Sequence, residues 1–110
     1  MEPRRGEVWW VSFDPSLGGE IQKTRPAVIL SNNSANAGLN RVIVVPLTRQ
    51  TAKVYPGEAI VQLEGEERKA MADQIMTASK KRLRSRVGAL SPSDMISVEK
   101  AVLLQLGIRK

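Results

Sequence analysis

Short apolar runs separated by polar turns are the feature that most limits the fold of this chain. The runs cover residues 8–11, 27–30 and 42–45, and they are rich in valine, isoleucine and tryptophan. Such residues favour extended structure. The segments between the runs contain glycine, proline, asparagine and serine, which favour turns. The pattern therefore predicts a sheet of short strands joined by polar loops.

About five or six strands are expected along the chain. They span residues 7–13, 27–32, 41–48, 58–63, 69–77 and, more briefly, 87–90. The first strand is apolar on both faces, so we expect both faces to be covered. Pro46 has no backbone donor, so we expect the third strand to reach a sheet edge or a bulge there. Single helical turns are expected at residues 33–38 and 79–83.

A C-terminal helix is the clearest element. Ser91 is a capping residue, Pro92 suits the first helical position, and Asp94 puts an acid three residues after the cap. Gly107 is expected to end the helix. Apolar residues recur between these ends at helical spacing: Met95, Val98, Ala101, Val102, Leu104 and Leu106. This stripe predicts a helix that packs on the sheet, and the whole chain is expected to be one α+β domain, a small and partly open β-barrel.

Composition narrows the function. The chain of 110 residues has a net charge of +6 and a pI of about 10.2, which favours a polyanionic partner such as nucleic acid or an acidic protein. Histidine and cysteine are absent, which excludes a histidine base, a thiolate site and a disulfide. No cluster of acids suggests a metal cage, and we expect no cofactor. No leader segment or membrane span is apparent, so the cytoplasm is the expected location.

A polar loop at residues 18–26 separates the first two strands. It offers the carboxylate of Glu20, the ammonium of Lys23, the hydroxyl of Thr24 and the guanidinium of Arg25, a set that suits a phosphate and its leaving groups. Pro26 favours an extended conformation for the residue before it, so we expect Arg25 at the base of the loop. The plain alternative is a solvated loop without a site.

The sequence resembles the MazF/PemK family of toxin endoribonucleases over nearly its whole length. The matching segments are residues 5–9, 19–20, 24–32, 45–48, 72–75 and 88–91. The resemblance implies a MazF/PemK-like toxin domain over residues 1–110, with the SH3-like barrel shared by CcdB, PemK and MazF. It also implies a homodimer, an acidic MazE-like antitoxin, and sequence-specific cleavage of single-stranded mRNA without metal or ribosome, which would stop translation and growth.

The resemblance also implies roles for individual residues. Arg25 and Thr48 match the catalytic arginine and threonine of the family, and Glu20 matches an acidic loop position that is sometimes the base. Asp73 is the alternative base, but Met71 stands where the PemK branch has a catalytic arginine, which favours the arrangement around Arg25. Contacts to RNA are expected from polar and charged residues in five regions: Gln22, Lys23, Thr24, Ser31, Asn32, Arg49, Gln50, Lys53, Asp73, Gln74, Lys80, Arg84 and Arg86.

These residue types fit the chemistry. RNA carries its own nucleophile, the 2′-hydroxyl, so the protein has to take a proton, stabilise the phosphorane and assist the leaving 5′-oxygen. The expected products are a 2′,3′-cyclic phosphate, or a 3′-phosphate after opening, and a 5′-hydroxyl. Two alternatives stay open, a CcdB-like toxin that poisons DNA gyrase and a plain nucleic-acid-binding barrel. Trp9 and Trp10 are expected to be core or dimer contacts, not platforms for stacked bases.

Overall fold

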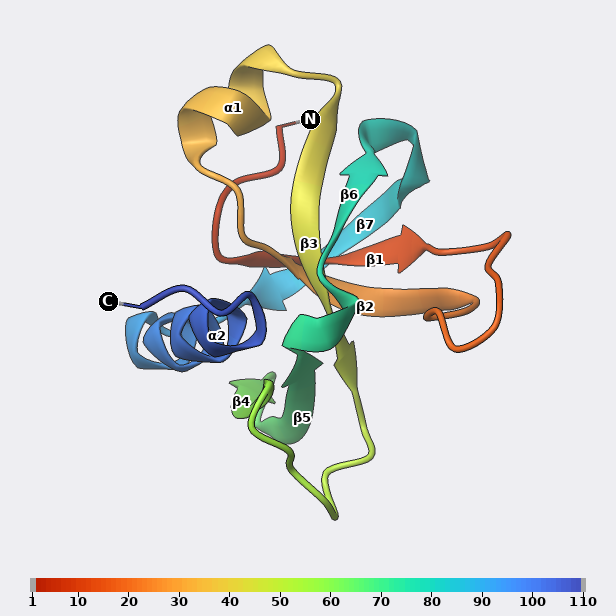
Figure 1. The fold of residues 1–110 in the computed structure, drawn as a ribbon. Helices are drawn as coiled ribbons and strands as arrows, with labels where there is room; N and C mark the ends of the chain where they lie inside the picture. The colour runs from red at the N-terminus through yellow and green to blue at the C-terminus, as the bar shows by residue number, and fades with distance from the viewer. Residues whose placement is uncertain (1, 110) are drawn as a thin grey trace.

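Seven short strands form an antiparallel sheet that curls around itself, and one long helix lies against it (Figure 1). The computed structural model describes residues 2–109. The strands are β1 (Glu7–Ser12), β2 (Thr24–Ile29), β3 (Arg41–Thr48), β4 (Glu58–Leu63), β5 (Glu66–Met71), β6 (Met76–Ser79) and β7 (Leu83–Ala89). The helices are α1 (Asn33–Gly38) and α2 (Pro92–Gln105), and 3-10 turns cover Ala72–Gln74 and Lys80–Arg82. The sheet order is β4-β5-β3-β2-β1-β7, and β6 also pairs with β3, so the predicted α+β barrel with a C-terminal helix is confirmed.

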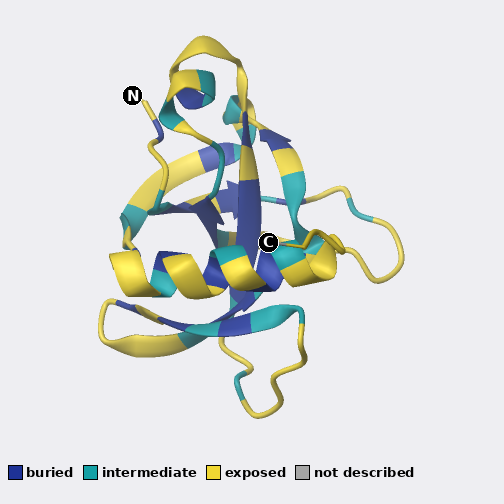
Figure 2. Ribbon diagram, turned by 60° about the vertical axis from the view of Figure 1, so that its left-hand side comes forward, coloured by how far each residue is buried: buried dark blue, intermediate teal, exposed yellow. Residues whose placement is uncertain are grey.

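The sheet is buried on both faces where β1, β2 and β3 run. In β1, Val8 belongs to a helix-side core, whereas Trp9 and Val11 belong to a far-side core. The helix-side core also takes Val28, Val45, Leu47, Ala59, Val61, Leu63, Ala70, Ala72, Leu90, Met95, Val98, Ala101 and Val102. The far-side core also takes Phe13, Ala27, Ile29, Val42, Val44, Ala78 and Leu83. Figure 2 shows the buried residues gathered in these central strands. The first strand is thus covered on both faces, as predicted, except at Trp10, which is 40% exposed.

The predicted strand over residues 69–77 is wrong, because the chain breaks into β5, a turn and β6. Leu47 of β3 faces Ala70 of β5, so a regular ladder would bring Val44 opposite residue 73, but Val44 faces Met76 of β6. The extra three residues are taken up by the 3-10 turn Ala72–Gln74. The break lets one strand, β3, hold β6 at its beginning and β5 at its end.

Pro46 lies in the interior of the sheet, not at the edge or bulge that was predicted. It pairs with Ala27 of β2. On the other side of β3, the ladder with β6 ends at Val44 and the ladder with β5 begins at Leu47. The missing N–H of Pro46 therefore falls in the gap between two partner strands, where no ladder hydrogen bond is lost.

The C-terminal helix keeps its predicted caps but has a narrower apolar stripe. The Ser91 hydroxyl accepts from the backbone N–H of Asp94 at 3.1 Å, and Gly107 follows the helix with φ 72°. Met95, Val98, Ala101 and Val102 are buried. Leu104 and Leu106 are 60% and 54% exposed, so their predicted place in the stripe is wrong. Leu104 lies off the face formed by the buried residues, and Leu106 comes after the last helical turn.

Smaller elements agree with the predictions to within a few residues. The helical turn at 33–38 is α1, and the turn at 79–83 is the 3-10 turn Lys80–Arg82. The second strand begins earlier than predicted, because its pairing with β1 extends to Thr24 opposite Ser12. The last strand, β7, is longer than predicted, because it pairs along β1 from Glu7 to Val11.

Glu7 supplies a pH-dependent part of the stability. Its carboxylate accepts from the backbone N–H of Arg4 at 2.8 Å, the indole of Trp9 at 3.1 Å and Nε of Arg86 at 2.9 Å. Burial raises the pKa of the Glu7 carboxyl, but these donors and the charge of Arg86 outweigh burial, so the pKa lies below its ordinary value.

We predict that Glu7→Gln lowers the free energy of unfolding by about 1–2 kcal/mol at neutral pH, because charge-assisted hydrogen bonds are lost. Since the folded-state pKa is depressed, this stabilisation is present above the pKa of the unfolded chain. It disappears as the pH falls through the folded-state pKa. Urea unfolding of both proteins over a pH series measures the difference, which should shrink in acid. A difference that stays constant down to the lowest pH would contradict the assignment.

Candidate active site

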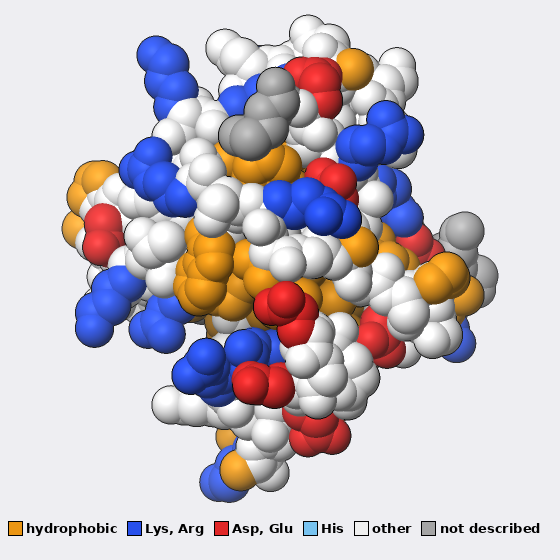
Figure 3. All heavy atoms as spheres, turned by 180° about the vertical axis from the view of Figure 1, so that it is seen from behind, with side chains coloured by type: hydrophobic (Ala, Val, Ile, Leu, Met, Phe, Trp, Pro, Cys, Tyr) orange, Lys and Arg blue, Asp and Glu red, His pale blue; other side chains and the backbone are white. Residues whose placement is uncertain are grey.

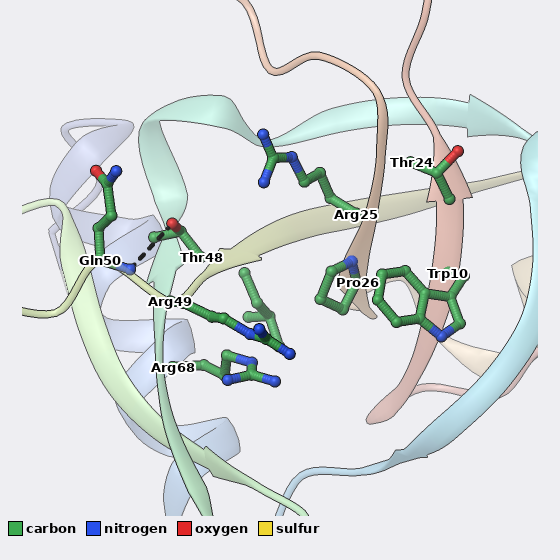
Figure 4. A pocket seen from close by; sticks show the side chains of 9 residues that line it. Trp10, Thr24, Arg25, Pro26, Thr48, Arg49, Gln50 and Arg68 are labelled. Carbon is green, nitrogen blue, oxygen red and sulfur yellow. Dashed lines mark hydrogen bonds between the residues drawn. The ribbon is translucent and has the colours of Figure 1, made fainter.

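Arg25 lies where the loop from β1 rejoins the sheet. It is the second residue of β2 and pairs with Val11, so its predicted position at the base of the loop is confirmed. Its Nε donates to the carbonyl of Gln22 at 3.2 Å, which orients the guanidinium while leaving its terminal nitrogens free of the loop. Within residues 2–109, Arg25 forms no ion pair. Figure 4 shows its side chain extending toward the side of Thr48.

Thr48 is the last residue of β3 and stands across from Arg25. Its hydroxyl oxygen accepts from the backbone N–H of Gln50 at 3.2 Å, so the hydroxyl hydrogen remains available to a ligand. A hollow of about 360 Å³, here called the Arg25 hollow, opens between the two residues. It is lined by Gly18, Gly19, Glu20, Ile21, Gln22, Arg25, Leu47, Thr48, Gln50, Met71 and Gln74. The three predicted catalytic residues therefore share one hollow.

The loop that carries Glu20 is fastened to the 3-10 turn by Gln74. The side-chain oxygen of Gln74 accepts from the N–H of Ile21 at 3.2 Å, and its nitrogen donates to the carbonyl of Gly19 at 3.0 Å. Glu20 in turn accepts from the N–H of Leu17 at 2.6 Å. Gln74, predicted as an RNA contact, thus also positions the loop beside Arg25.

The two candidate bases occupy different places. Asp73 lines a neighbouring hollow with Phe13, Ile75 and Arg82, and neither Arg25 nor Thr48 lines that hollow. Glu20 lines both hollows. Met71, which stands where the PemK branch has a catalytic arginine, lines the Arg25 hollow. Of the two carboxylates, Glu20 lines the same hollow as Arg25 and Thr48, and Asp73 does not.

A second hollow of about 380 Å³, here called the Trp10 hollow, adjoins the first (Figure 4). It is lined by Trp10, Thr24, Arg25, Pro26, Leu47, Thr48, Arg49, Gln50 and Arg68. Arg25, Leu47, Thr48 and Gln50 line both hollows.

The sequence predicted Arg49 and Gln50 as RNA contacts but did not point to Arg68, because the predicted strand began one residue after it. It also assigned Trp10 to the core or the dimer. The alternation of β5, which sets Arg68 and Ala70 on one face, was the signal that could have found Arg68.

The remaining predicted RNA contacts do not line either hollow, and several hold the fold together. Ser31 accepts from the N–H of Ile43 at 3.0 Å, and Asn32 caps α1 by accepting from the N–H of Ala35 at 2.8 Å. The others make bonds of their own: Arg84 donates to the carbonyl of Lys81, Arg86 pairs with Glu7, Lys80 pairs with Glu2, the backbone N–H of Lys23 donates to Asp14, and the carbonyl of Lys53 accepts from Lys69. RNA contact by these residues stays a prediction.

Positive charge is spread over the surface. Figure 3 shows the face behind that of Figure 1, where Lys and Arg side chains surround an apolar central area with acidic side chains among them. In the described part of the chain, no group of three or more Asp, Glu, His or Cys side chains is arranged to hold a metal ion. No helix within residues 2–109 is long and apolar enough to cross a membrane.

Comparison with known proteins adds a family to this geometry. Residues 4–106 match the family described as PemK-like, MazF-like toxin of type II toxin-antitoxin system. The chain is 36% identical to Endoribonuclease MazF9 of Mycobacterium tuberculosis, over 96% of this chain and 97% of that protein. It is 34% identical to Endoribonuclease toxin MazF of Escherichia coli K12, over 96% of this chain and 95% of that protein.

Solved structures share the fold. A mycobacterial endoribonuclease in complex with its cognate antitoxin superposes with a TM-score of 0.82 and 26% identity, covering 98% of both chains. MazF from Deinococcus radiodurans superposes with a TM-score of 0.86 and 24% identity, covering 98% of this chain and 99% of that one.

Proposed function

Since this chain belongs to the PemK-like, MazF-like family of toxins of type II toxin-antitoxin systems, we propose that it is an endoribonuclease toxin that cleaves RNA in the Arg25 hollow. The observation that supports this most is the meeting of Glu20 and Arg25, from the first loop and the start of β2, with Thr48, from the distant end of β3, in one hollow. A CcdB-like gyrase poison or a plain binding barrel would not need this set of groups.

Each residue has a role that its chemistry allows. Arg25 can hold two phosphoryl oxygens with its fork of donors, and its very high pKa suits it to stabilising charge, not to giving up a proton. The free hydroxyl of Thr48 can donate to another phosphoryl oxygen. Glu20 is the proposed base that takes the proton of the 2′-hydroxyl. The proton then leaves with the 5′-oxygen, so the products are a 2′,3′-cyclic phosphate and a 5′-hydroxyl.

The substrate is proposed to be single-stranded mRNA, cleaved in the cytoplasm at particular sequences. The 2′-hydroxyl supplies the nucleophile, so the reaction requires no metal. The test is incubation of the purified protein with a long RNA in EDTA, with Arg25→Ala as the matched control. Cleavage to 5′-hydroxyl ends by the wild type is expected. RNA that stays intact in EDTA and is cut only after Mg²⁺ is added would refute the metal-independent mechanism, and intact RNA under both conditions would refute the nuclease.

We propose that the protein works as a homodimer with RNA in a groove between the two copies. Exposed apolar side chains such as Leu39 and Ile43, at 42% and 39% exposure, are available for a contact between copies. Sedimentation equilibrium is expected to give twice the chain mass at micromolar concentration. A monomer that cleaves RNA at the full rate would contradict the proposal.

An acidic, flexible MazE-like antitoxin is the second proposed partner. The net charge of +6 favours such a peptide, and one relative of solved structure is in complex with its cognate antitoxin. Because the peptide and RNA would both be drawn to the cationic site, we predict that they compete and that binding weakens as salt is added. Fluorescence anisotropy of a labelled peptide measures both effects. A saturated complex that still cleaves RNA at the full rate would rule out direct blockage.

A further inference from the structure

Trp10 is the exception in an otherwise buried strand. Its neighbours Trp9 and Val11 are 2% and 0% exposed, whereas Trp10 is 40% exposed. Its Cα faces that of Pro26 across the β1–β2 ladder, and its side chain forms one wall of the Trp10 hollow. A flat aromatic face open to solvent beside a reactive phosphate site is suited to stacking a nucleotide base.

Two arginines form the opposite wall of the Trp10 hollow. Figure 4 shows the side chains of Arg49 and Arg68 running side by side in the direction of Trp10, and both also line the neighbouring pocket together with Trp10. The side chain of Arg68 is only 12% exposed. Two guanidinium groups that line one hollow repel each other, and an anion between them would offset that repulsion.

The nearby carboxylates do not fully balance the positive charges of Arg49 and Arg68. Nη1 of Arg68 pairs with Glu66 at 3.0 Å, but the Glu66 side chain is 64% exposed. Glu64 lies on the rim of the same pocket, and it forms no ion pair with either arginine within residues 2–109. Arg49 has no carboxylate partner in that range, and Nε of Arg68 is buried without a hydrogen-bond partner. Arg49 therefore lacks a counter-charge, which a phosphate in the hollow would supply.

The hollow is continuous with the site of cleavage. Arg25 and Thr48 line both hollows, so a nucleotide in the Trp10 hollow would be joined directly to the phosphate held by Arg25. We propose that the Trp10 hollow binds the nucleotide next to the cleaved bond, with its base stacked on Trp10 and its outer phosphate between Arg49 and Arg68. This proposal rests on the proposed nuclease function and adds a subsite to it.

The subsite explains a preference for single strands. A base can lie on Trp10 only after it has left its neighbours, which costs little in single-stranded RNA and much more in a duplex. It also replaces the expectation that Trp10 is a core or dimer contact. Trp10, Arg49 and Arg68 are binding residues here, so their loss should weaken RNA binding more than it slows cleavage of bound RNA.

Tryptophan fluorescence can test the stacking directly, because Trp9 is buried and Trp10 is the only other tryptophan. The probe is a short RNA that spans a cut site mapped on a long RNA, with a 2′-deoxy sugar at the cleaved position so that it binds without reacting. We expect the probe to quench Trp10 emission, and the same sequence as a duplex to quench it far less. Trp10→Ala should weaken binding about 10–100-fold, while Trp10→Phe should keep most of the affinity.

Charge variants test the phosphate contact. Arg68→Gln and Arg49→Gln should each weaken binding about 10-fold and make it less sensitive to salt. Arg41→Gln removes the same charge from an exposed position outside both hollows and is the matched control. Equal effects at Arg41 and Arg68 would reduce the subsite to general charge attraction and overturn the proposal.

Two further outcomes would overturn it. One is wild-type affinity for Trp10→Ala. The other is weak binding by Trp10→Ala that recovers fully at high protein concentration together with the dimer, which would make Trp10 a dimer contact. The subsite and the nuclease fail separately. Normal cleavage with an unaffected Trp10→Ala variant refutes only the subsite. Quenching of Trp10 by a single-stranded RNA of mixed sequence, with no cleavage of natural RNA, refutes the nuclease and leaves nucleotide binding at Trp10.

Discussion

Arg25→Ala is expected to slow cleavage of saturated RNA by about 10²–10³-fold, which corresponds to roughly 3–4 kcal/mol of lost transition-state stabilisation. The phosphorane carries more negative charge than the bound phosphodiester, so a guanidinium aimed at it acts mainly on the chemical step. Arg25 has no carboxylate partner within residues 2–109, and its single bond from Nε to Gln22 leaves the other donors for the phosphate. Single-turnover cleavage at saturating enzyme measures the effect.

Arg25→Lys separates this role from simple anchoring. An ammonium keeps the charge but loses the planar fork, so we expect it to restore little of the rate. If Arg25 were only one phosphate anchor among several, lysine would restore binding and Arg25→Ala would cut saturated RNA at nearly the wild-type rate. That result would show that the catalytic assignment at Arg25 is wrong.

The second large effect is expected at Glu58, which holds the ammonium of a buried lysine. Lys69 is 8% exposed, and its Nζ lies 3.2 Å from Oε1 of Glu58 and 2.9 Å from the carbonyl of Lys53. The same Glu58 oxygen accepts from the N–H of Tyr55 at 2.9 Å. These bonds fasten the loop between β3 and β4, which carries Arg49 and Gln50 into the Trp10 hollow.

Glu58→Gln is expected to lower the free energy of unfolding by about 3 kcal/mol, because it leaves a buried ammonium without its counter-charge. The double variant Glu58→Leu/Lys69→Leu removes both charges and should cost less than the single change. Glu2→Gln breaks the exposed 3.7 Å pair with Lys80 and is the control, with an expected cost below about 1 kcal/mol. Urea unfolding monitored by circular dichroism compares all four proteins. A single variant as stable as the Glu2 control would show that the pair contributes nothing.

Much of the fold was predictable because its signals are local. The caps Ser91 and Gly107 and the spacing of Met95, Val98 and Val102 depend on neighbours in the sequence, and they were correct. The break at Ala72–Gln74 was not predictable, because it arises from the need of β5 and β6 to pair with the same strand. The alternation of apolar residues in a sequence does not show how many residues stay unpaired when two segments pair with the same distant strand.

In the candidate site, too, local signals could be predicted from the sequence and long-range contacts could not. Arg25 and Thr48 follow from short segments with a family resemblance, and the structure brings them to one hollow. The tethering of the loop by Gln74 and the presence of Arg68 and Arg49 in one hollow join residues far apart in the chain. The sequence alone does not show which of these side chains meet in the folded chain.

The central strand β3 links folding to toxicity. Its first half pairs with β6 and contributes Val42 and Val44 to the far-side core, while its last residue, Thr48, stands in the Arg25 hollow. A shift of one residue in its pairing would turn Leu47 out of the helix-side core and turn Thr48 out of the Arg25 hollow. The Arg25 hollow is therefore complete only when both halves of β3 are paired. The same strand that closes the sheet also carries a residue of the site, so a change that disturbs the pairing of β3 should disturb the site with it.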